Sequence, residues 1–328
     1  MSEHGRMAQL SGWLSAQLGD KPFELAPASA DASFRRYFRV RCGDESHIVM
    51  DAPPGKEDCR PFVAVARAFS RVGLNVPEVL AADLENGFLL LSDFGDRQYL
   101  QVLNAGNVGG LYDDALQSLL VLQGAGSGGG ILPPYDEALL LKEMDLFRDW
   151  YLEGYLGMSL DAGQARLLER SFSLLAASAL EQPRVWVHRD YHSRNLMLVE
   201  GRNPGILDFQ DAVYGPLCYD LVSLLRDCYI AWPAAQVDAW VEAYFTRART
   251  QGGLEGIDLA QFRRWFDWMG MQRHFKAIGI FSRLYLRDGK PGYLGDIPRT
   301  MNYVLESAAR YGVFKALKDF LADLPRRS

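Results

Sequence analysis

The segment VWVHRDYHSRNLMLVEGRNPGILDFQDA, residues 185–212, contains the residues whose types and spacing could carry out chemistry. Asp190 ends a His-Arg-Asp triplet, Asn195 follows five residues later, and Asp208 precedes a phenylalanine. Transfer of a phosphoryl group needs a carboxylate that orients and deprotonates the attacking hydroxyl. It also needs oxygen ligands that hold Mg²⁺ against the nucleotide phosphates. This arrangement supplies all of these groups and therefore predicts phosphoryl transfer.

The spacing also predicts how the three side chains come together. Residues 196–199 and 204–207 read as two short strands joined by a four-residue turn. In the expected register Asn195 lies opposite Asp208, and directly opposed residues of antiparallel strands are only ~4.5–5.5 Å apart. An amide oxygen and a carboxylate at the open end of this hairpin would form a clamp for Mg²⁺. Asp190 would lie on the loop that enters the hairpin.

A purely structural role is the alternative for each of these residues. Asp190 and Asp208 could be turn residues that accept local backbone hydrogen bonds, and Asn195 could cap a turn. We expect His188 to brace the loop through a hydrogen bond rather than to act as a general base. The joint occurrence of all three residues downstream of a β-rich segment favours the catalytic interpretation.

The elements that must position these residues divide the chain into two parts. Before residue 95, the patterns predict helices at 7–19 and after Pro61, and strands at 34–41, 46–52, 77–83 and 88–94. After it, helices are predicted at 111–123, 136–155, 162–181, 218–231, 235–250, 258–286 and 297–321, interrupted by a β-rich stretch at 185–209. We therefore predict a two-lobed α+β fold of the protein-kinase type. A small β-rich N-lobe (1–94) would precede a larger, mostly helical C-lobe (95–328) that contains the catalytic loop (188–195), and a ligand would bind between the lobes.

The composition narrows the possible partners. A net charge of -6 provides no basic surface for nucleic acid, and no apolar run approaches the ~20 residues that span a bilayer. The N-terminal residues do not resemble a signal peptide, and the four cysteines lack the spacing of a zinc site. We expect a cytoplasmic monomer that binds neither nucleic acid nor membranes.

With these motifs established, the chain resembles the aminoglycoside phosphotransferase/choline kinase family over roughly residues 20–300. Within this family, three segments look like the bacterial cell-wall-recycling kinases that phosphorylate N-acetylmuramate and N-acetylglucosamine at the anomeric hydroxyl. These segments are VMDAPP (49–54), HRDYHSRNLM (188–197) and GILDFQDAVYGPLCYDLVSLLRDCY (205–229). The resemblance implies ATP and Mg²⁺ as cofactors and a small sugar as the substrate.

The resemblance also implies roles for individual residues. Asp190 would be the base, Asn195 and Asp208 the Mg²⁺ ligands, and Asp220 a buried carboxylate that ties down the catalytic loop. ATP would be held through backbone groups of the hinge at Ser92, Asp93 and Phe94.

Two positions depart from the family's pattern. Met50 occupies the place of the strand lysine that pairs with nucleotide phosphates, and the phosphate-covering segment 27–34 contains no glycine. Backbone N–H groups of that segment could still approach phosphates. We expect Ser29, Ser33 and Arg35 to contact the nucleotide. The basic residues that could replace the lysine are Arg35, Arg36, Arg39 and Lys56.

Basic residues in the C-terminal part favour a neutral or anionic substrate over a cationic one. The predicted helix around 265–290 carries Arg273 and Lys276 among aromatic residues, and Arg194 and Arg226 also lie in the second part of the chain. Any of the four could pair with a carboxylate such as the lactyl group of N-acetylmuramate. The alternative for each is a charge on a solvated helix face.

Two other functions remain open from the sequence. One is a kinase for another small hydroxyl compound, such as an aminoglycoside, a choline-like compound or an amino alcohol. The other is a non-catalytic nucleotide-binding module, which Met50 at the lysine position would suit. The sequence does not determine the preferred amino sugar, the anomer, the replacement for the lysine or any protein partner.

Overall fold

The computed structural model describes residues 3–29, 34–125 and 130–325. The chain forms two compact units. The first comprises residues 1–104 and 195–211, and the second comprises residues 105–194 and 212–328. The lobe boundary after residue 94 stays a prediction.

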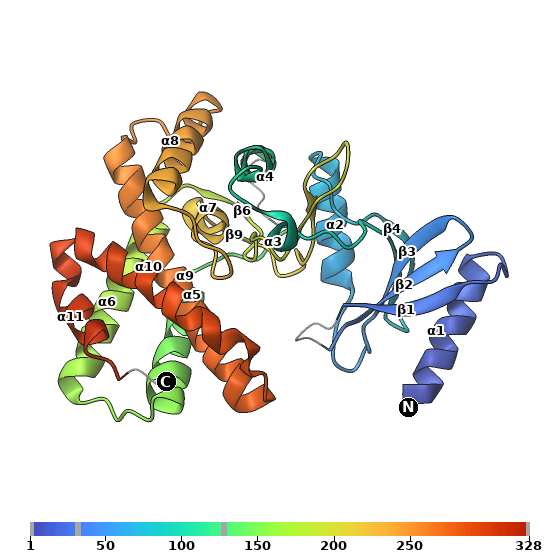
Figure 1. Cartoon of the computed structure of the whole chain (residues 1–328), viewed down its shortest axis with the longest axis horizontal. Helices are drawn as coiled ribbons and strands as arrows, with labels where there is room; N and C mark the ends of the chain where they lie inside the picture. Colours follow the sequence, from blue (N-terminus) through green and yellow to red (C-terminus); the bar gives the residue numbers. More distant parts are fainter. Residues whose placement is uncertain (1–2, 30–33, 126–129, 326–328) are drawn as a thin grey trace. The chain divides into compact units, whose positions relative to one another are not determined.

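A five-stranded antiparallel sheet forms the centre of the first unit, with its strands in the order β1-β2-β3-β5-β4 (Figure 1). The strands are β1 (Glu24–Ser29), β2 (Arg36–Cys42), β3 (Glu45–Asp51), β4 (Val79–Asp83) and β5 (Phe88–Ser92). Helix α1 (Glu3–Gln17) lies against this sheet, because an apolar core joins Leu10 and Leu14 of the helix to Val40, Val49, Phe88 and Leu90. These elements confirm the β-rich composition that the sequence predicts for this part.

Two further helices and a short hairpin complete the first unit. They are α2 (Arg60–Arg71), α3 (Tyr99–Val102), and the strands β7 (Leu196–Met197) and β8 (Gly205–Ile206). Pro61 stands in the first turn of α2, where a missing backbone N–H costs no hydrogen bond. Phe62 and Phe69 of α2 are buried at helical spacing, and both rings pack against Phe209, which follows β8. This packing attaches the hairpin segment to the rest of the unit.

Helices dominate the second unit, as predicted. They are α4 (Val108–Gln123), α5 (Glu137–Leu146), α6 (Ala162–Leu180), α7 (Cys218–Leu225), α8 (Ala234–Thr250), α9 (Leu259–Asp288), α10 (Ile297–Arg310) and α11 (Lys315–Ala322). A π-helical stretch (Phe147–Tyr155) continues α5, and a 3₁₀ turn (Pro291–Asp296) precedes α10. Strands β6 (Arg184–Val187) and β9 (Val213–Pro216) pair in an antiparallel manner. The α+β class is therefore confirmed.

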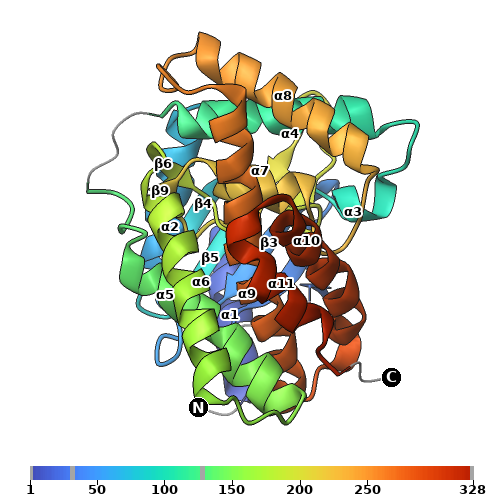
Figure 2. The same ribbon diagram turned by 90° about the vertical axis from the view of Figure 1, so that its left-hand side faces the viewer.

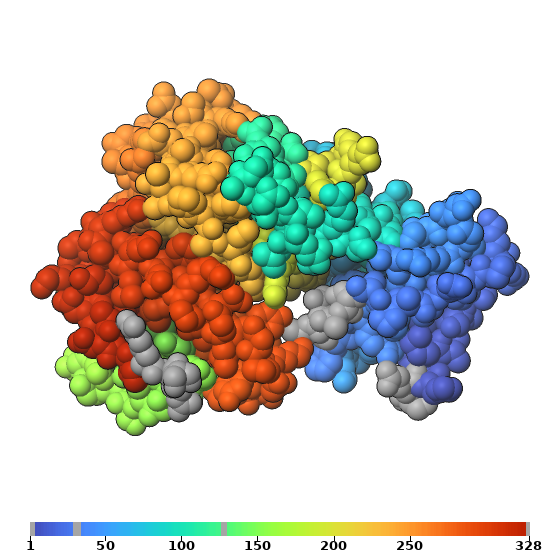
Figure 3. All heavy atoms as spheres, in the orientation of Figure 1, coloured from blue at the N-terminus to red at the C-terminus, as the bar shows by residue number. Residues whose placement is uncertain are grey.

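The long helix α9 organises the second unit. Figure 2 shows α9 between the green helices α5 and α6 and the red helices α10 and α11. Asp258 caps its first turn by accepting a hydrogen bond from the backbone N–H of Gln261 at 2.8 Å. A Cβ atom at Gly279 would lie only 2.3 Å from the backbone of Leu146, so this glycine permits the close contact with α5. In the space-filling view the red C-terminal residues lie between the orange region of α8 and the green region of α5 and α6 (Figure 3).

Two predicted helices are wrong in length, and a third changes its geometry. The helix predicted at 218–231 ends at Leu225, because the backbone of Arg226 leaves the helical region. The helix predicted at 136–155 changes to π-helical geometry after Leu146. The helix predicted at 297–321 is two helices separated by a 3₁₀ turn at 312–314. In the described part of the chain, no helix is long and apolar enough to cross a membrane.

Candidate active site

The hairpin of β7 and β8 holds Asn195 and Asp208 in the first unit. Leu196 opposes Ile206 in this hairpin, so the expected register, with Asn195 opposite Asp208, is wrong by one residue. The backbone N–H of Leu207 instead donates to the carbonyl oxygen of Asn195 at 2.9 Å. Pro204 has no N–H to donate to a ladder, and pairing starts at Met197 and Gly205 instead of at Val199 and Pro204.

The two side chains nevertheless meet. The backbone of Asp208 has a φ of 62°, outside the strand region, and this redirects its carboxylate. Asn195 Nδ2 lies 3.5 Å from Asp208 Oδ2, and Gln210 Nε2 donates to Asp208 Oδ1 at 2.7 Å. The predicted proximity of Asn195 and Asp208 thus exists, although its geometric cause differs from the one expected.

These oxygen-bearing groups fit a magnesium ion. A half-turn of the Asn195 amide would present its oxygen beside the Asp208 carboxylate. Gln210 Oε1 is buried and has no hydrogen-bond partner among the described residues, so another polar group is missing from its surroundings. Mg²⁺ usually takes only one or two carboxylates, together with water and substrate phosphates. The described residues accordingly contain no cluster of three or more His, Cys, Asp or Glu that could enclose a metal.

The catalytic loop follows β6 in the second unit and is anchored by Asp220. This side chain is 0% exposed, and it accepts hydrogen bonds from the backbone N–H groups of His188 at 2.6 Å and Arg189 at 3.0 Å. Arg189 has a φ of 76°, a conformation that these bonds help to hold. Burial raises the pKa of Asp220 to about 7, although the two N–H groups favour its charged form and so lower the pKa. His188 Nδ1 accepts the backbone N–H of Asp190 at 3.2 Å, which agrees with a bracing role.

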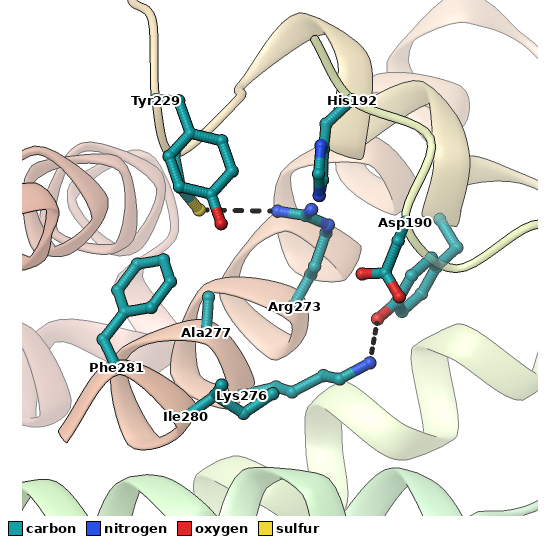
Figure 4. A pocket seen from close by; sticks show the side chains of 10 residues that line it. Asp190, His192, Tyr229, Arg273, Lys276, Ala277, Ile280 and Phe281 are labelled. Atoms are coloured by element: carbon teal, nitrogen blue, oxygen red, sulfur yellow. Dashed lines mark hydrogen bonds between the residues drawn. The ribbon is translucent and has the colours of Figure 1, made fainter. Parts of the chain in front are cut away.

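Asp190 lines a cavity of about 410 Å³ in the second unit (Figure 4). Asp190 lies close to Arg273 and to the ammonium end of Lys276, and Phe281 stands at the apolar end (Figure 4). The other lining residues are His192, Tyr219, Cys228, Tyr229, Ala277 and Ile280.

Charges around the cavity keep Asp190 ionised. Burial alone would raise its pKa, but the charges of Lys276, Arg273 and Arg189 outweigh burial and lower it to about 2. Asp190 is therefore a carboxylate at neutral pH, as a proton acceptor must be.

Glu143 of α5 connects the catalytic loop with Lys276, a role that the sequence did not indicate. Its buried carboxylate pairs with the guanidinium of Arg189 and lies 3.2 Å from Lys276 Nζ. Lys276 also donates to the hydroxyl of Tyr219 at 2.9 Å. A single carboxylate thus positions both a neighbour of Asp190 and the lysine beside it.

Replacing Glu143 with glutamine is expected to destabilise the protein by about 3 kcal/mol, because the buried Lys276 and the partly buried Arg189 lose their common counter-ion. It is also expected to lower kcat at least tenfold, since Asp190 and Lys276 lose their fixed positions. Urea unfolding and initial rates would measure both effects. Glu242→Gln is the matched control, because its ion pair with Arg263 is on the surface. Wild-type stability and kcat in Glu143→Gln would contradict this role.

The structure places the four basic residues that the sequence suggested for substrate binding in different surroundings. Arg273 and Lys276 line the cavity of Asp190. The guanidinium of Arg194 lies 4.0 Å from the ring centre of Tyr229, another residue of that cavity. Arg226 does not line this cavity; it lines a second one and pairs with Asp267 at 2.6 Å. We propose a structural role for Arg226 in place of the substrate role.

The candidate nucleotide residues lie around the sheet of the first unit. Ser92 ends β5, and its hydroxyl accepts the backbone N–H of Glu78 at 2.9 Å. Asp93 uses its side chain in an ion pair with Arg39 at 2.6 Å, and a nucleotide contact through its backbone stays a prediction. Phe94 closely approaches Gly205, where a Cβ atom would lie 2.6 Å from its ring. Ser29 ends β1, and Ser33 lies outside the described residues.

Met50 is fully buried in β3 and offers no charge to a phosphate. Arg36 pairs with the buried carboxylate of Asp51 at 2.6 Å, and Arg39 is engaged by Asp93. Lys56 lies over the ring of Phe34, with its ammonium 4.4 Å from the ring centre. Arg35 pairs with Glu57, just before α2, at 2.9 Å.

The fold is that of kinases that act on small molecules. The chain belongs to the phosphotransferase enzyme family, whose sequence pattern matches residues 24–255. The predictions of a phosphotransferase and of its family are therefore confirmed.

Curated relatives cover almost the whole chain. A protein of Pseudomonas aeruginosa named N-acetylmuramate/N-acetylglucosamine kinase is 49% identical over 99% of both chains. A protein of Neisseria meningitidis with the same name is 44% identical over 97% of this chain and 96% of its own.

Solved structures share the fold at low sequence identity. A choline kinase from Cryptosporidium parvum matches with a TM-score of 0.63 and 11% identity, over 96% of this chain and all of its own. An ADP-bound aminoglycoside phosphotransferase matches with a TM-score of 0.57 and 15% identity, over 92% of this chain and 98% of its own. The predicted kinase-like fold is confirmed.

Proposed function

We propose that this protein transfers the γ-phosphoryl group of ATP to the anomeric hydroxyl of N-acetylmuramate or N-acetylglucosamine. The product would be the sugar 1-phosphate, which places the reaction in peptidoglycan recycling. The observation that carries the proposal is the ionised Asp190 on the wall of a cavity with basic and aromatic sides. The names of relatives that are 44–49% identical over nearly the whole chain support the choice of sugars.

Asp190 would orient the sugar hydroxyl and accept its proton as the oxygen attacks the γ-phosphorus. An anomeric hydroxyl is more acidic than that of an ordinary alcohol, so a carboxylate with a low pKa can serve as its base. Positioning and charge neutralisation provide most of the catalysis in phosphoryl transfer. Glu143 contributes to this positioning through Arg189 and Lys276.

Asn195 and Asp208 would hold Mg²⁺, which neutralises charge on the β- and γ-phosphates when bound. Gln210 would keep the Asp208 carboxylate in place through their 2.7 Å hydrogen bond. The chain passes directly from Arg194, at the end of the catalytic loop, to Asn195. The base and the metal ligands are thus parts of one continuous segment.

ATP would bind through the backbone of Ser92, Asp93 and Phe94, and through the segment that contains Ser29 and Ser33. We propose Arg35 as the replacement for the strand lysine. Its 2.9 Å ion pair with Glu57 parallels the lysine–glutamate pair that positions phosphates in protein kinases. We further propose that the protein acts in the cytoplasm, where ATP is available, and that it acts as a monomer.

A panel of acceptors separates this function from that of another small-molecule kinase. Lys276 and Arg273 in the cavity disfavour cationic acceptors by charge repulsion. With ATP and Mg²⁺, the protein should release ADP in the presence of either amino sugar, and not with choline or an aminoglycoside. ADP release with the amines and none with either sugar would contradict the proposal. No ADP release with any acceptor, together with intact ATP binding, would support a non-catalytic module.

A further inference from the structure

Arg273 is a buried cation that pairs with no carboxylate of the residues that the structure describes. Its side chain lies on α9 at the wall of the Asp190 cavity, and the residue is 5% exposed. Within the described ranges, Nη1 donates to Cys228 Sγ at 3.5 Å, and Nε has no partner although it is buried. A charge taken out of water without an ion pair is costly, so this guanidinium indicates a missing anion.

Neighbouring basic groups differ from Arg273 in this respect. Lys276, one helical turn further along α9, already has the carboxylate of Glu143 at 3.2 Å and the hydroxyl of Tyr219 at 2.9 Å. Arg226 has the carboxylate of Asp267 at 2.6 Å. These two cations are neutralised inside the protein, whereas Arg273 has no such counter-ion in residues 3–29, 34–125 and 130–325.

Acidic groups near Arg273 are committed to other partners. Asp227 accepts hydrogen bonds from the backbone N–H and the hydroxyl of Ser193 at 2.9 and 2.5 Å, and from the backbone N–H of Tyr229 at 2.8 Å. Asp190 and Asp227 both raise the pKa of Arg273, yet no ion pair of Arg273 within 4.0 Å occurs in the described part of the chain. In the proposed reaction, moreover, Asp190 binds the sugar hydroxyl.

His192 adds a second buried polar atom, its Nδ1, to the wall of this cavity. It is 8% exposed and lines the same cavity, and its Nδ1 atom is buried with no hydrogen-bond partner among the described residues. Burial lowers the pKa of His192, so the ring is neutral and can donate or accept one hydrogen bond at this site. Figure 4 shows His192 and Arg273 next to each other, with Asp190 beside them.

We propose that Arg273, assisted by His192, binds the lactyl carboxylate of N-acetylmuramate and thereby sets the preference between the two sugars. This inference rests on the proposed function. In a pyranose ring the lactyl-bearing carbon C3 is separated from the anomeric carbon by one atom. A sugar whose anomeric hydroxyl is at Asp190 therefore has its C3 substituent within the same small cavity. N-acetylglucosamine has a hydroxyl at this position, and water would take the place of its missing carboxylate.

The test compares the two sugars in the same variant. Arg273→Gln should lower kcat/KM for N-acetylmuramate about 100-fold, mainly through KM, because a buried charge-assisted pair is lost. The same change should lower kcat/KM for N-acetylglucosamine by no more than about fivefold, since that sugar offers no carboxylate. Arg273→Lys should recover part of the lost preference. Arg287→Gln, in the exposed last turn of α9, is the matched control and should leave the ratio of the two sugars unchanged.

Equal losses for both sugars in a folded Arg273→Gln protein would overturn the proposal, because Arg273 would then act on the transferred phosphoryl group or on Asp190.

A second experiment uses the wild-type protein and does not depend on the variant's folding. N-acetylmuramate should be phosphorylated with a kcat/KM about 100-fold above that of its methyl ester, in which the carboxylate is neutral. Equal rates for acid and ester would overturn the proposal. If the wild-type protein phosphorylates neither sugar, the proposed function itself fails, and this outcome is distinct from both others.

Discussion

Replacing Asp190 with asparagine is expected to lower kcat by about 10³- to 10⁴-fold and to leave ATP binding nearly unchanged. Asparagine has the same size but cannot accept the proton of the sugar hydroxyl, and a general base contributes roughly 10²- to 10⁴-fold to a rate. The upper part of this range is expected because Asp190 also orients the hydroxyl. Initial rates of ADP release and ATP titration by calorimetry would measure the two quantities.

Asp44→Asn is a matched control for this change, since Asp44 is an exposed turn residue between β2 and β3. It should have wild-type kcat and ATP affinity. A kcat within tenfold of wild type for Asp190→Asn would show that Asp190 is not the base. Loss of ATP binding together with kcat would instead indicate that the substitution disturbs the fold.

Replacing Asp208 or Asn195 with alanine is expected to lower kcat by about 10²-fold or more and to raise the Mg²⁺ concentration needed for half-maximal rate at least tenfold. Each substitution removes one oxygen ligand that the protein would provide to Mg²⁺. The bound metal would neutralise charge on the phosphates, so weaker metal binding lowers the rate. Asp208→Ala should have the larger effect, because it removes a charge. Rates measured across a Mg²⁺ titration would give both values.

Gln210→Ala provides a graded comparison for this metal clamp. It removes the 2.7 Å hydrogen bond to Asp208 but no predicted ligand, so its Mg²⁺ requirement should lie between those of wild type and Asp208→Ala. An unchanged Mg²⁺ requirement in both Asn195→Ala and Asp208→Ala would contradict the clamp.

Local patterns predicted much of the fold and the order of the site residues. The amphipathic spacing of α2 and the residue patterns of β2, β3, β4 and β5 are local properties, and the sequence predicts these elements close to their observed positions. The hairpin register was wrong because Pro204 and the left-handed backbone of Asp208 affect pairing in ways that hydrophobic alternation does not show. Even so, the expected neighbours Asn195 and Asp208 lie 3.5 Å apart.

Long-range electrostatics could not be predicted from the sequence. Glu143 belongs to a helix with no recognisable motif, and only packing of α5 against α9 brings it to Lys276 and Arg189. Likewise, Arg226 and Arg273 are equally basic in the sequence, yet one has Asp267 as its partner and the other has no carboxylate partner among the described residues. The partners of a charged side chain depend on the tertiary structure, and these partners determine the role of that side chain.

The regiochemistry of the product tests the central claim most directly. Phosphorus NMR of the reaction of wild-type protein with ATP, Mg²⁺ and N-acetylmuramate or N-acetylglucosamine identifies the carbon that carries the phosphate. The predicted product shows phosphorus coupled to the anomeric proton, for both sugars, and Asp190→Asn should form it at a rate at least about a thousandfold lower. Phosphate on C6 or another hydroxyl, or no sugar phosphate at all, would contradict the assignment of Asp190 as the base for the anomeric hydroxyl.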